Sequence, residues 1–470
     1  MDIIFGTDGW RGLLDREMDH DSVSLVAQAF AQYALQRSSS PSVVIGYDGR
    51  RNSRTFAELF ASILDGNGIR YYLSDKVVPT PVVSYTVKAR SLDLGVMITA
   101  SHNPPEYNGI KFKASYGGPF STEETHIVET LIGRSRIRRS IEPVRTEDLL
   151  MPYRKHLETI VDFAMISKSS IIPLIDSMSG AGATILQDML AEHSVKSHTI
   201  FEIPDESFSG RFAEPIEKNL KPLSEELQRG TFSLGVATDG DADRLGVLLE
   251  NGEWLSSQET ILLLTDYLKR TKNISGDIIK TSSVTNLLKA NFESDECKVH
   301  DVQVGFKYIC EKMIETNAAF GAEESGGYGF KGHIPERDGI LSALLFIEML
   351  ASSPYNRLSE YVSEKRKEFG EIFYDRIDHP YHKEDRNDKL PMLAKNAPKM
   401  IASFTVKDSA QFYSSRGIVN GLKFSLEGNA RWLLLRSSET EPLIRIYAEG
   451  ESMAEVKDIL NAGMELVEHH

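Results

Sequence analysis

Cysteine is nearly absent from this chain, with only two among 470 residues. Cys297 and Cys310 have no Cys-x-x-Cys spacing, and they fit reduced thiols better than a disulfide framework. We assign them no function. Their scarcity excludes a fold held together by disulfides.

Long apolar runs are also missing. No run reaches the roughly 18 residues that a membrane-spanning helix needs. The first residues, MDIIFGTDGW, contain neither the basic segment nor the long apolar segment of a signal peptide. We therefore expect a cytoplasmic protein without a membrane partner.

Positive charge is in deficit, because 53 Lys and Arg residues face 68 Asp and Glu residues, for a formal net charge of −15. This charge argues against nucleic acid or acidic membrane as a partner. An anionic ligand would need a local basic pocket. With 41% hydrophobic and 26% charged residues, the chain has the composition of an ordinary folded protein.

One pattern occurs three times along the chain. A chain of 470 residues is too long for a single core and predicts three or four domains. Residues 41–69, 170–195 and 276–296 each read as a short apolar strand, a polar loop and an amphipathic helix. The loops align at Asp48, Asp176 and Lys280. We therefore predict three α/β domains of similar design.

Polar and charged stretches mark the domain boundaries. Residues 134–148 lead out of the first domain toward a linking helix, and the last hundred residues change to an α+β pattern that closes with a helix from about Ser452. The predicted fold is three similar mixed α/β domains and a smaller C-terminal α+β domain. Their expected ranges are 1–145, 146–253, 254–368 and 369–470.

A serine stands in a loop rich in Pro, Asn and Gly, TASHNPPEYNGIKFK at residues 99–113, directly after the apolar run LGVMIT. A hydrolase serine needs a nearby base held by a carboxylate. His102 is a poor base for Ser101, because adjacent side chains seldom point to the same place. A surface turn with incidental polar residues is the alternative.

Three aspartates, Asp239, Asp241 and Asp243, alternate in TDGDADR between two runs that resemble strands. Close carboxylates repel one another unless a cation joins them, and an all-oxygen set selects a hard ion such as Mg²⁺. An EF-hand is excluded because it needs Gly where Arg244 stands and a helix where the chain has a strand. An aspartyl-phosphate phosphatase that uses Asp239 as its nucleophile and an acidic turn are the alternatives.

Two further loops carry groups suited to a sugar phosphate. In FGAEESGGYGF, the side chains of Glu323, Glu324 and Ser325 can bind sugar hydroxyls, while the glycines let the backbone approach. Donors suited to phosphate in RSSETEPLIRIY are Arg436, Ser437, Ser438 and Thr440. Alone, each loop is also compatible with an ordinary turn.

Together, in this order and at these distances, the four loops resemble the α-D-phosphohexomutase family of phosphoglucomutases and phosphomannomutases. The resemblance extends from FGTDGWRG at residues 5–12 to the phosphate loop near the C-terminus. It implies four domains around a deep central cleft. It also implies an enzyme that moves a phosphoryl group within a sugar phosphate.

The resemblance gives Ser101 a role as the family's phosphoserine. It would donate its phosphoryl group to a sugar monophosphate and recover the other one after the bound glucose 1,6-bisphosphate turns round. Ser101 and the three aspartates match the ligands of Mg²⁺, which neutralises charge on the transferring group. No histidine base is required, because the serine rests as a phosphoester.

Other residues match the family's chemical groups. Lys111 matches the lysine of general acid–base catalysis, and Arg11 matches an arginine near the same centre. We expect neighbouring cations to lower the pKa of Lys111 toward a useful range. Arg244 resembles the arginine that faces the phosphoserine, and His102 either assists or braces the loop. The expected substrate contacts are Glu323, Ser325, Arg436, Ser438, Thr440, Lys280 and Lys307. For the two lysines, a solvated surface position is the alternative.

Two departures bear on specificity. Some mannose-accepting relatives read GEMSGH where this chain reads AEESGG, with Gly327 in place of their histidine. The form here looks more like the glucose-preferring members. Glu439 stands where the phosphate loop usually has Gly or Asn, and we expect its side chain to turn outward.

These features predict a Mg²⁺-dependent mutase that interconverts glucose 1-phosphate and glucose 6-phosphate, as a monomer or homodimer. Phosphomannomutase or dual activity is the second interpretation. Phosphoglucosamine mutase is the third, because its sugar loop commonly reads EQSGH. A sugar-phosphate phosphatase and a non-catalytic sensor are the alternatives from other classes, and the intact serine and aspartates argue against the sensor.

Overall fold

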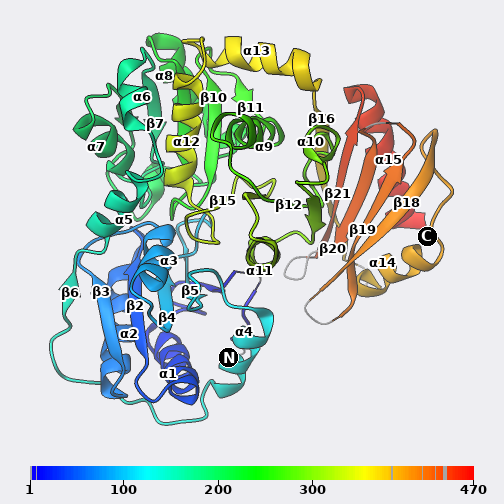
Figure 1. Ribbon diagram of the computed structural model, residues 1–470. Helices are drawn as coiled ribbons and strands as arrows, with labels where there is room; N and C mark the ends of the chain where they lie inside the picture. The colour runs from blue at the N-terminus through cyan, green and yellow to red at the C-terminus, as the bar shows by residue number, and fades with distance from the viewer. Residues whose placement is uncertain are drawn as a thin grey trace.

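The computed structural model describes residues 3–6, 8–382, 385–414, 417–428, 430–437 and 442–469, without the side chains of Asn387 and His469. The chain forms four successive units, each with its own main sheet (Figure 1). Three units are mixed α/β structures and the fourth is an antiparallel sheet with helices, which confirms the predicted fold class.

Unit one spans residues 10–147 and has a six-stranded sheet in the order β1-β5-β4-β2-β3-β6. Its strands are β1 (Trp10–Leu13), β2 (Ser42–Tyr47), β3 (Arg70–Ser74), β4 (Leu94–Ile98), β5 (Tyr107–Lys113) and β6 (Thr146–Glu147). Its helices are α1 (His20–Arg37), α2 (Ser53–Gly66), α3 (Thr80–Ala89) and α4 (Thr122–Leu131). Val43 and Ile45 of β2 pack in the core with α1 and α2, and Val44 packs with α3. Helices therefore cover both faces of this sheet.

Unit two spans residues 150–255, with strands in the order β11-β10-β9-β7-β8. They are β7 (Pro173–Asp176), β8 (His198–Ile200), β9 (Leu234–Thr238), β10 (Leu245–Leu249) and β11 (Trp254–Leu255). Its helices are α5 (Leu150–Leu157), α6 (Phe163–Lys168), α7 (Ile185–Glu192) and α8 (Lys221–Arg229), with short turns η1 (Phe208–Gly210) and η2 (Glu217–Asn219). The small strand β6 lies just past the expected boundary at residue 145 and pairs with β3, so it belongs to the first sheet.

Unit three spans residues 257–369, with strands in the order β13-β12-β14-β15. They are β12 (Ile278–Thr281), β13 (Val299–Val302), β14 (Phe320–Ala322) and β15 (Tyr328–Phe330). Its helices are α9 (Ser257–Asp266), which continues as η3 (Tyr267–Thr271), α10 (Leu287–Phe292), α11 (Phe306–Thr316), α12 (Gly339–Ala351) and α13 (Leu358–Phe369).

Helix α12 joins units two and three. It begins at Asp338, whose side chain accepts a hydrogen bond from the Leu341 amide, and its residues 339–350 are all buried. A helix that is apolar on every side belongs inside a protein. The helix packs against β9 and β10 of unit two as well as α9 of its own unit. One core cluster consequently extends from Val44 to Phe369, through the first three units.

A shared hairpin places the polar loops. In units one to three, a parallel strand is followed by an antiparallel one: β4 by β5, β9 by β10, and β14 by β15. The turns of these three hairpins are the serine loop at residues 99–106, the aspartate loop at residues 239–244 and the sugar loop at residues 323–327. They all lie beyond the carboxyl end of a parallel strand, which is where α/β sheets carry their sites.

Unit four spans residues 373–469, and its sheet has the order β16-β21-β20-β19-β18-β17 with every pair antiparallel. The strands are β16 (Phe373–Pro380), β17 (Met400–Ile401), β18 (Phe404–Tyr413), β19 (Val419–Leu426), β20 (Trp432–Ser437) and β21 (Leu443–Gly450). Helices α14 (Arg386–Lys395) and α15 (Met453–His469) pack with this sheet in a separate core. In Figure 1 the unit stands to one side of the other three. Among the described residues, no helix combines the length and apolar character required to cross a membrane.

Candidate active site

Ser101 follows β4 and is fully buried. Its φ is +53°, in the left-handed region that residues with side chains rarely adopt. This conformation directs the hydroxyl toward unit two, where Oγ donates a hydrogen bond of 3.0 Å to Oδ2 of Asp239. Its amide donates to Oγ1 of Thr99 at 2.9 Å. The serine and aspartate loops therefore meet directly.

His102 lies closer to this hydroxyl than expected. Its Nδ1 is 3.4 Å from Oγ of Ser101. The prediction that the two adjacent side chains point apart is wrong, because the left-handed turn at Ser101 brings them to one side. Burial, together with the charges of Arg244 and Arg11, holds the pKa of His102 well below its usual value. The imidazole is therefore neutral near pH 7.

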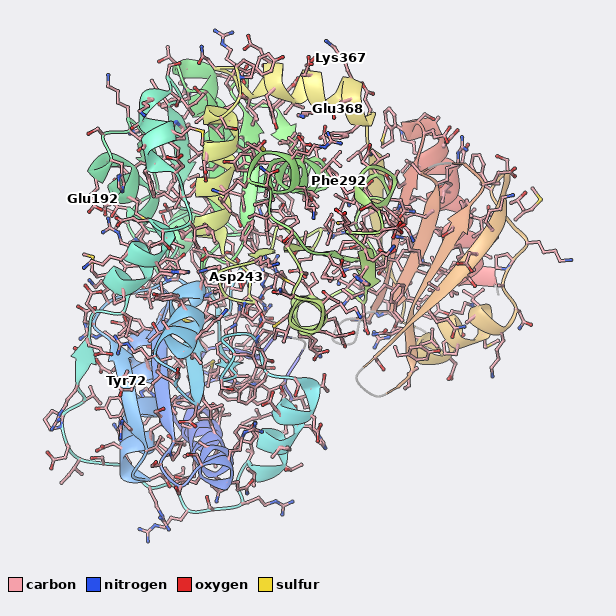
Figure 2. The ribbon with its side chains drawn as sticks, in the orientation of Figure 1. Tyr72, Glu192, Asp243, Phe292, Lys367 and Glu368 are labelled. Carbon is pink, nitrogen blue, oxygen red and sulfur yellow. The ribbon has the colours of Figure 1, made fainter. Side chains whose placement is uncertain are left out.

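The three aspartates form one buried cluster after β9. One carboxylate oxygen from each of Asp239, Asp241 and Asp243 lies within 4.8 Å of the others. Oδ1 of Asp239 accepts hydrogen bonds from the amides of Asp243 at 2.9 Å and Arg244 at 3.1 Å. These bonds set the turn. Figure 2 shows Asp243 where units one and two meet.

Two buried oxygens of this cluster, Oδ1 of Asp241 and Oδ1 of Asp243, accept no hydrogen bond from any residue that the structure describes. Burial raises the pKa of Asp239 well above its ordinary value, and the other two carboxylates raise it further. Buried orphan oxygens are costly unless a ligand satisfies them. The cluster can thus hold a metal ion with an all-oxygen shell.

Lys111 extends from β5 of unit one into the same cluster. Its Nζ lies 2.8 Å from Asp241, 3.1 Å from Asp243 and 3.0 Å from Asp8, and the residue is 1% exposed. Burial opposes its charge, but these three carboxylates raise the pKa of Lys111 above its ordinary value. The prediction that neighbouring cations lower this pKa is wrong, because carboxylates lie nearest to the ammonium group.

Two more arginines border the centre. Arg11 donates from Nη1 to Oδ1 of Asn103 in the serine loop at 2.6 Å. Burial lowers the pKa of Arg11 from its ordinary value. Arg244 has Nε at 3.9 Å from both Asp239 and Asp243. Both predicted arginines therefore lie beside the serine and aspartate loops.

The sugar loop is joined to the aspartate loop. Leu245 donates its amide to the carbonyl of Gly326 at 2.8 Å. Within the loop, Oε1 of Glu323 accepts from Oγ of Ser325 at 2.7 Å. Gly326 has φ +90°, and an added Cβ would meet the Leu245 carbonyl at 2.6 Å. Glycine is required there by both conformation and space.

Arg337 was not predicted, yet it connects three loops. Nη2 is 2.9 Å from Oδ2 of Asp243 and Nη1 donates to Oε1 of Glu323 at 3.1 Å. The guanidinium also pairs with Asp8 of unit one. A Cβ on Gly327 would meet Cδ of Arg337 at 2.3 Å. The sequence feature that could have identified Arg337 is the charged stretch PERD directly before the apolar helix α12.

Lys280 and Lys307 are both buried, so the alternative of solvated surface lysines is wrong. Nζ of Lys280 donates to the Val284 carbonyl at 3.0 Å and pairs with Asp301. Nζ of Lys307 donates to Oγ1 of Thr122 in unit one at 2.7 Å. Lys307 thus connects units one and three.

Unit four contacts the sugar loop. Arg376 of β16 lies 3.6 Å from Oε1 of Glu324. Within the part of the chain that the structure describes, the buried Nε of Arg436 in β20 has no hydrogen-bond partner, so it can donate to a ligand. Ser437 of the same loop is buried. Two further predicted members, Ser438 and Thr440, lie outside the described residues together with Glu439.

Comparisons with known proteins agree along the whole chain. Domain families described as phosphoglucomutase/phosphomannomutase match it in order. They are alpha/beta/alpha domain I at 2–138, domain II at 151–252, domain III at 256–369, and the C-terminal domain at 386–465. The phosphoglucomutase/phosphomannomutase of Thermococcus kodakarensis is 30% identical over 99% of this chain and 98% of its own.

Other similar proteins carry different sugar names. The phosphoglucosamine/phosphogalactosamine mutase of Sulfurisphaera tokodaii is 29% identical over 99% of each chain. The crystal structure of a candidate phosphomannomutase from Thermus thermophilus has 34% identity and a TM-score of 0.86, covering 100% of this chain and 99% of its own. The family predicted from four loops is confirmed. This chain belongs to the phosphoglucomutase/phosphomannomutase family, the α-D-phosphohexomutases, which are isomerases that transfer a phosphoryl group within one molecule.

Proposed function

We propose that this protein interconverts glucose 1-phosphate and glucose 6-phosphate, with Ser101 as the phosphoryl carrier and glucose 1,6-bisphosphate as the bound intermediate. The observation that carries the proposal is the contact of 3.0 Å between Oγ of Ser101 and Asp239, inside a buried cluster of three carboxylates. A resting phosphoester needs charge neutralisation more than it needs a base. Arg11 and Arg244 beside the serine loop, and a cation held by the three carboxylates, would meet that need.

Mg²⁺ suits the donor set. The unpaired buried oxygens of Asp241 and Asp243 and the Asp239 oxygen beside Ser101 are hard ligands. When bound, Mg²⁺ supplies positive charge against the oxygens of the transferring phosphoryl group. We assign Ser101 and the three aspartates to it.

The chain's own cations complete the centre. We assign proton exchange at the sugar hydroxyl to Lys111, and charge stabilisation of the phosphoryl group to Arg11 and Arg244. His102, neutral and with Nδ1 3.4 Å from Oγ, would lie beside the phosphoester oxygen. In the first transfer the sugar hydroxyl oxygen loses its proton and bonds to phosphorus while the bond from phosphorus to Oγ of Ser101 breaks. In the second, Oγ bonds to the phosphorus at the other end of the bisphosphate while that sugar oxygen–phosphorus bond breaks and the oxygen takes up a proton.

Substrate recognition is assigned to units three and four. Glu323 and Ser325 offer acceptors for sugar hydroxyls, and the unpaired Nε of Arg436 offers a donor to the remote phosphate. The further assigned contacts are Ser438, Thr440, Lys280 and Lys307. A binding site for this remote phosphate must accept a phosphate at either end of the sugar.

The sugar preference rests on the loop AEESGG. Its Gly327 leaves space that the Arg337 side chain fills, as the 2.3 Å approach to an added Cβ indicates. Phosphomannomutase or dual activity is the second candidate. Phosphoglucosamine mutase is the third, and the name of the Sulfurisphaera tokodaii relative favours testing it.

A coupled assay with glucose, mannose and glucosamine 1-phosphates tests the substrate. We expect kcat/KM to be highest for glucose 1-phosphate, by about tenfold or more, because a site built for one hydroxyl pattern leaves polar groups unpaired with another. A higher value for glucosamine 1-phosphate would contradict the proposal. Inorganic phosphate measured in parallel separates a mutase from a phosphatase, which would release it stoichiometrically.

A further inference from the structure

A single buried arginine holds the backbone of the serine loop. Arg50 follows β2 and is 3% exposed. Nη1 donates to the carbonyls of Pro104 at 2.9 Å and Tyr107 at 3.0 Å. Nη2 donates to the carbonyls of Ser101 and Asn103, both at 2.6 Å. One guanidinium therefore gathers four carbonyl oxygens of one loop.

Asp48 braces the arginine and the opposite side of Ser101. Its Oδ2 is 3.2 Å from Nε of Arg50 and accepts from Oγ1 of Thr99 at 2.6 Å. That same Oγ1 accepts the amide hydrogen of Ser101 at 2.9 Å. Arg50 binds the carbonyl of Ser101, and Asp48 acts on its amide through Thr99. Both backbone groups of Ser101 are consequently restrained.

These restraints act on an unusual conformation. Ser101 has φ +53°, which a residue with a side chain adopts only when its surroundings enforce it. In this conformation Oγ points at Asp239, 3.0 Å away. Released from Arg50, the loop would relax toward ordinary backbone angles and carry the hydroxyl away from the aspartates.

Unit two packs against the same guanidinium. The ring of Phe208 lies 4.7 Å from Cζ of Arg50. Gly240, in the aspartate loop, approaches the Ser101 carbonyl so closely that a Cβ there would lie 2.4 Å from it. Arg50 is thus enclosed between the serine loop and the unit that carries the aspartates.

We propose that Arg50, braced by Asp48, is a positioning residue for phosphoryl transfer: it holds Ser101 against the aspartate cluster through the loop backbone without contacting the sugar. This inference rests on the proposed function of Ser101 as phosphoryl carrier. It requires that loss of the guanidinium lowers kcat and leaves KM nearly unchanged, since the sugar and phosphate contacts lie in other loops.

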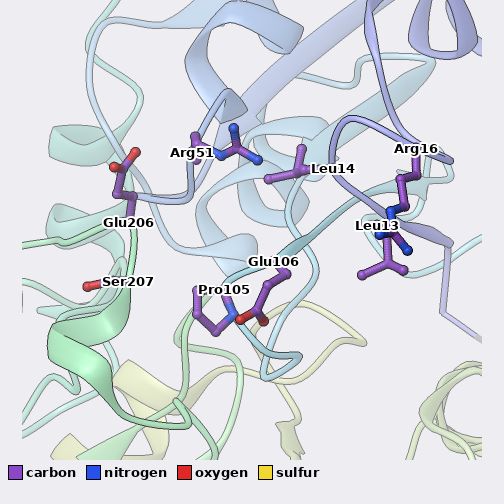
Figure 3. A pocket seen from close by; sticks show the side chains of 8 residues that line it. All are labelled: Leu13, Leu14, Arg16, Arg51, Pro105, Glu106, Glu206 and Ser207. Carbon is purple, nitrogen blue, oxygen red and sulfur yellow. The ribbon is translucent and has the colours of Figure 1, made fainter.

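The test compares Arg50→Ala with Arg51→Ala. The neighbouring Arg51 is exposed and pairs with Asp15 at 2.8 Å, so it provides a matched control. Arg51 lines an open pocket of about 510 Å³ together with Pro105 and Ser207 (Figure 3). Pro105 follows Pro104, whose carbonyl accepts from Arg50, and Ser207 precedes Phe208, whose ring packs against Arg50. The pocket thus lies next to the segments that enclose Arg50.

We expect Arg50→Ala to lower kcat about 100-fold or more, the cost of misplacing a reacting group by about 1 Å. KM should change by less than about threefold, as expected for an effect confined to the transition state. Millimolar guanidinium should restore part of the lost kcat in Arg50→Ala and none in Arg51→Ala. A melting temperature measured for each protein reports its folding.

An unchanged kcat in Arg50→Ala, or a loss that appears in KM instead, overturns the proposal, as does a kcat that guanidinium does not raise in a folded variant. If Arg50→Ala does not fold, Arg50→Lys decides by the same kcat and KM criteria. Ser101→Ala is assayed beside them: if it stays active, the proposed function fails. If Ser101→Ala is inactive while Arg50→Ala is fully active, only the role of Arg50 fails.

Discussion

Lys111 of unit one and Asp241 of unit two form a buried ion pair of 2.8 Å. This pair and the hydrogen bond from Ser101 to Asp239 bring the serine loop and the aspartate loop into one chemical centre. Oδ1 of Asp241 and Oδ1 of Asp243 accept no hydrogen bond from the described residues, and Nε of Arg244 stays 3.9 Å from the latter. A cation bound there would compete with Lys111 for the same carboxylates, which leads to the first prediction.

Removing the metal should abolish turnover. We expect excess chelator to stop the reaction and added Mg²⁺ to restore it, and Asp241→Asn to remain inactive at any Mg²⁺ concentration. Binding is measured without activity by the melting temperature: Mg²⁺ at 100 times its Kd stabilises the native state by about 2.7 kcal/mol. Asp188→Asn, an exposed aspartate of unit two, is the control. Full activity in excess chelator would contradict the assignment.

Arg436→Ala tests the proposed binding site for the phosphate remote from Ser101. Loss of a charge-assisted contact should cost about 1.5–3 kcal/mol, or about 10- to 150-fold in kcat/KM. The variant should still transfer its phosphoryl group once, release more glucose 1,6-bisphosphate, and regain activity in part when that bisphosphate is added. Lys407→Ala, exposed in the same unit, should behave as wild type. Unchanged kcat/KM and no extra bisphosphate release would place this binding site elsewhere.

Gly327→His tests the interpretation of the sugar loop. A Cβ at this position would lie 2.3 Å from Cδ of Arg337, so the arginine would have to move away from Glu323 and Asp243. We therefore expect Gly327→Ala and Gly327→His both to lower kcat/KM for every sugar phosphate by about tenfold or more, consistent with overpacking in a tight site. A clean shift toward mannose 1-phosphate without loss for glucose 1-phosphate would contradict the role given to Arg337.

The four loops were predictable because each carries its chemistry in a short stretch of sequence. Arg337 and Arg50 were not, because their partners come from distant segments: Glu323 and Asp243 for the first, the loop carbonyls for the second. The predicted direction of the Lys111 pKa shift was wrong for the same reason. The sequence around Lys111 does not reveal that carboxylates from two distant loops lie nearest to its ammonium group.

Local backbone conformation accounts for another difference. The rule that adjacent side chains diverge holds for ordinary strands and helices. Ser101 adopts a left-handed φ, which no sequence pattern identified, and His102 consequently lies beside its hydroxyl. The burial of Lys280 and Lys307 likewise depends on how units one and three pack together.

Acid should destabilise the protein partly through His156. Burial, aided by the charge of His333 at 3.0 Å, lowers the pKa of His156 to about 4. Its unfolded pKa is about 6.5, so between these values the unfolded chain binds more protons and stability falls as pH is lowered. The contribution is fully present above about pH 6.5. Urea unfolding from pH 7 to 4 should show a smaller loss in His156→Gln than in wild type, whereas the exposed His126→Gln should match wild type. Equal losses in all three would contradict this.

The most direct test of the central claim is the phosphorylation state of Ser101, measured by peptide mass spectrometry. The account predicts an added mass of about 80 Da, one phosphoryl group, on the peptide that carries Ser101. Ser101 should lose it in the first transfer to glucose 1-phosphate and be phosphorylated again by the bisphosphate in the second, and protein that has released the bisphosphate should regain it when glucose 1,6-bisphosphate is added. Ser115→Ala, an exposed serine beyond β5, should retain the modification and activity, while Ser101→Ala should lose both. An active Ser101→Ala enzyme, or a phosphoryl group on another residue that exchanges with substrate, would contradict the mechanism.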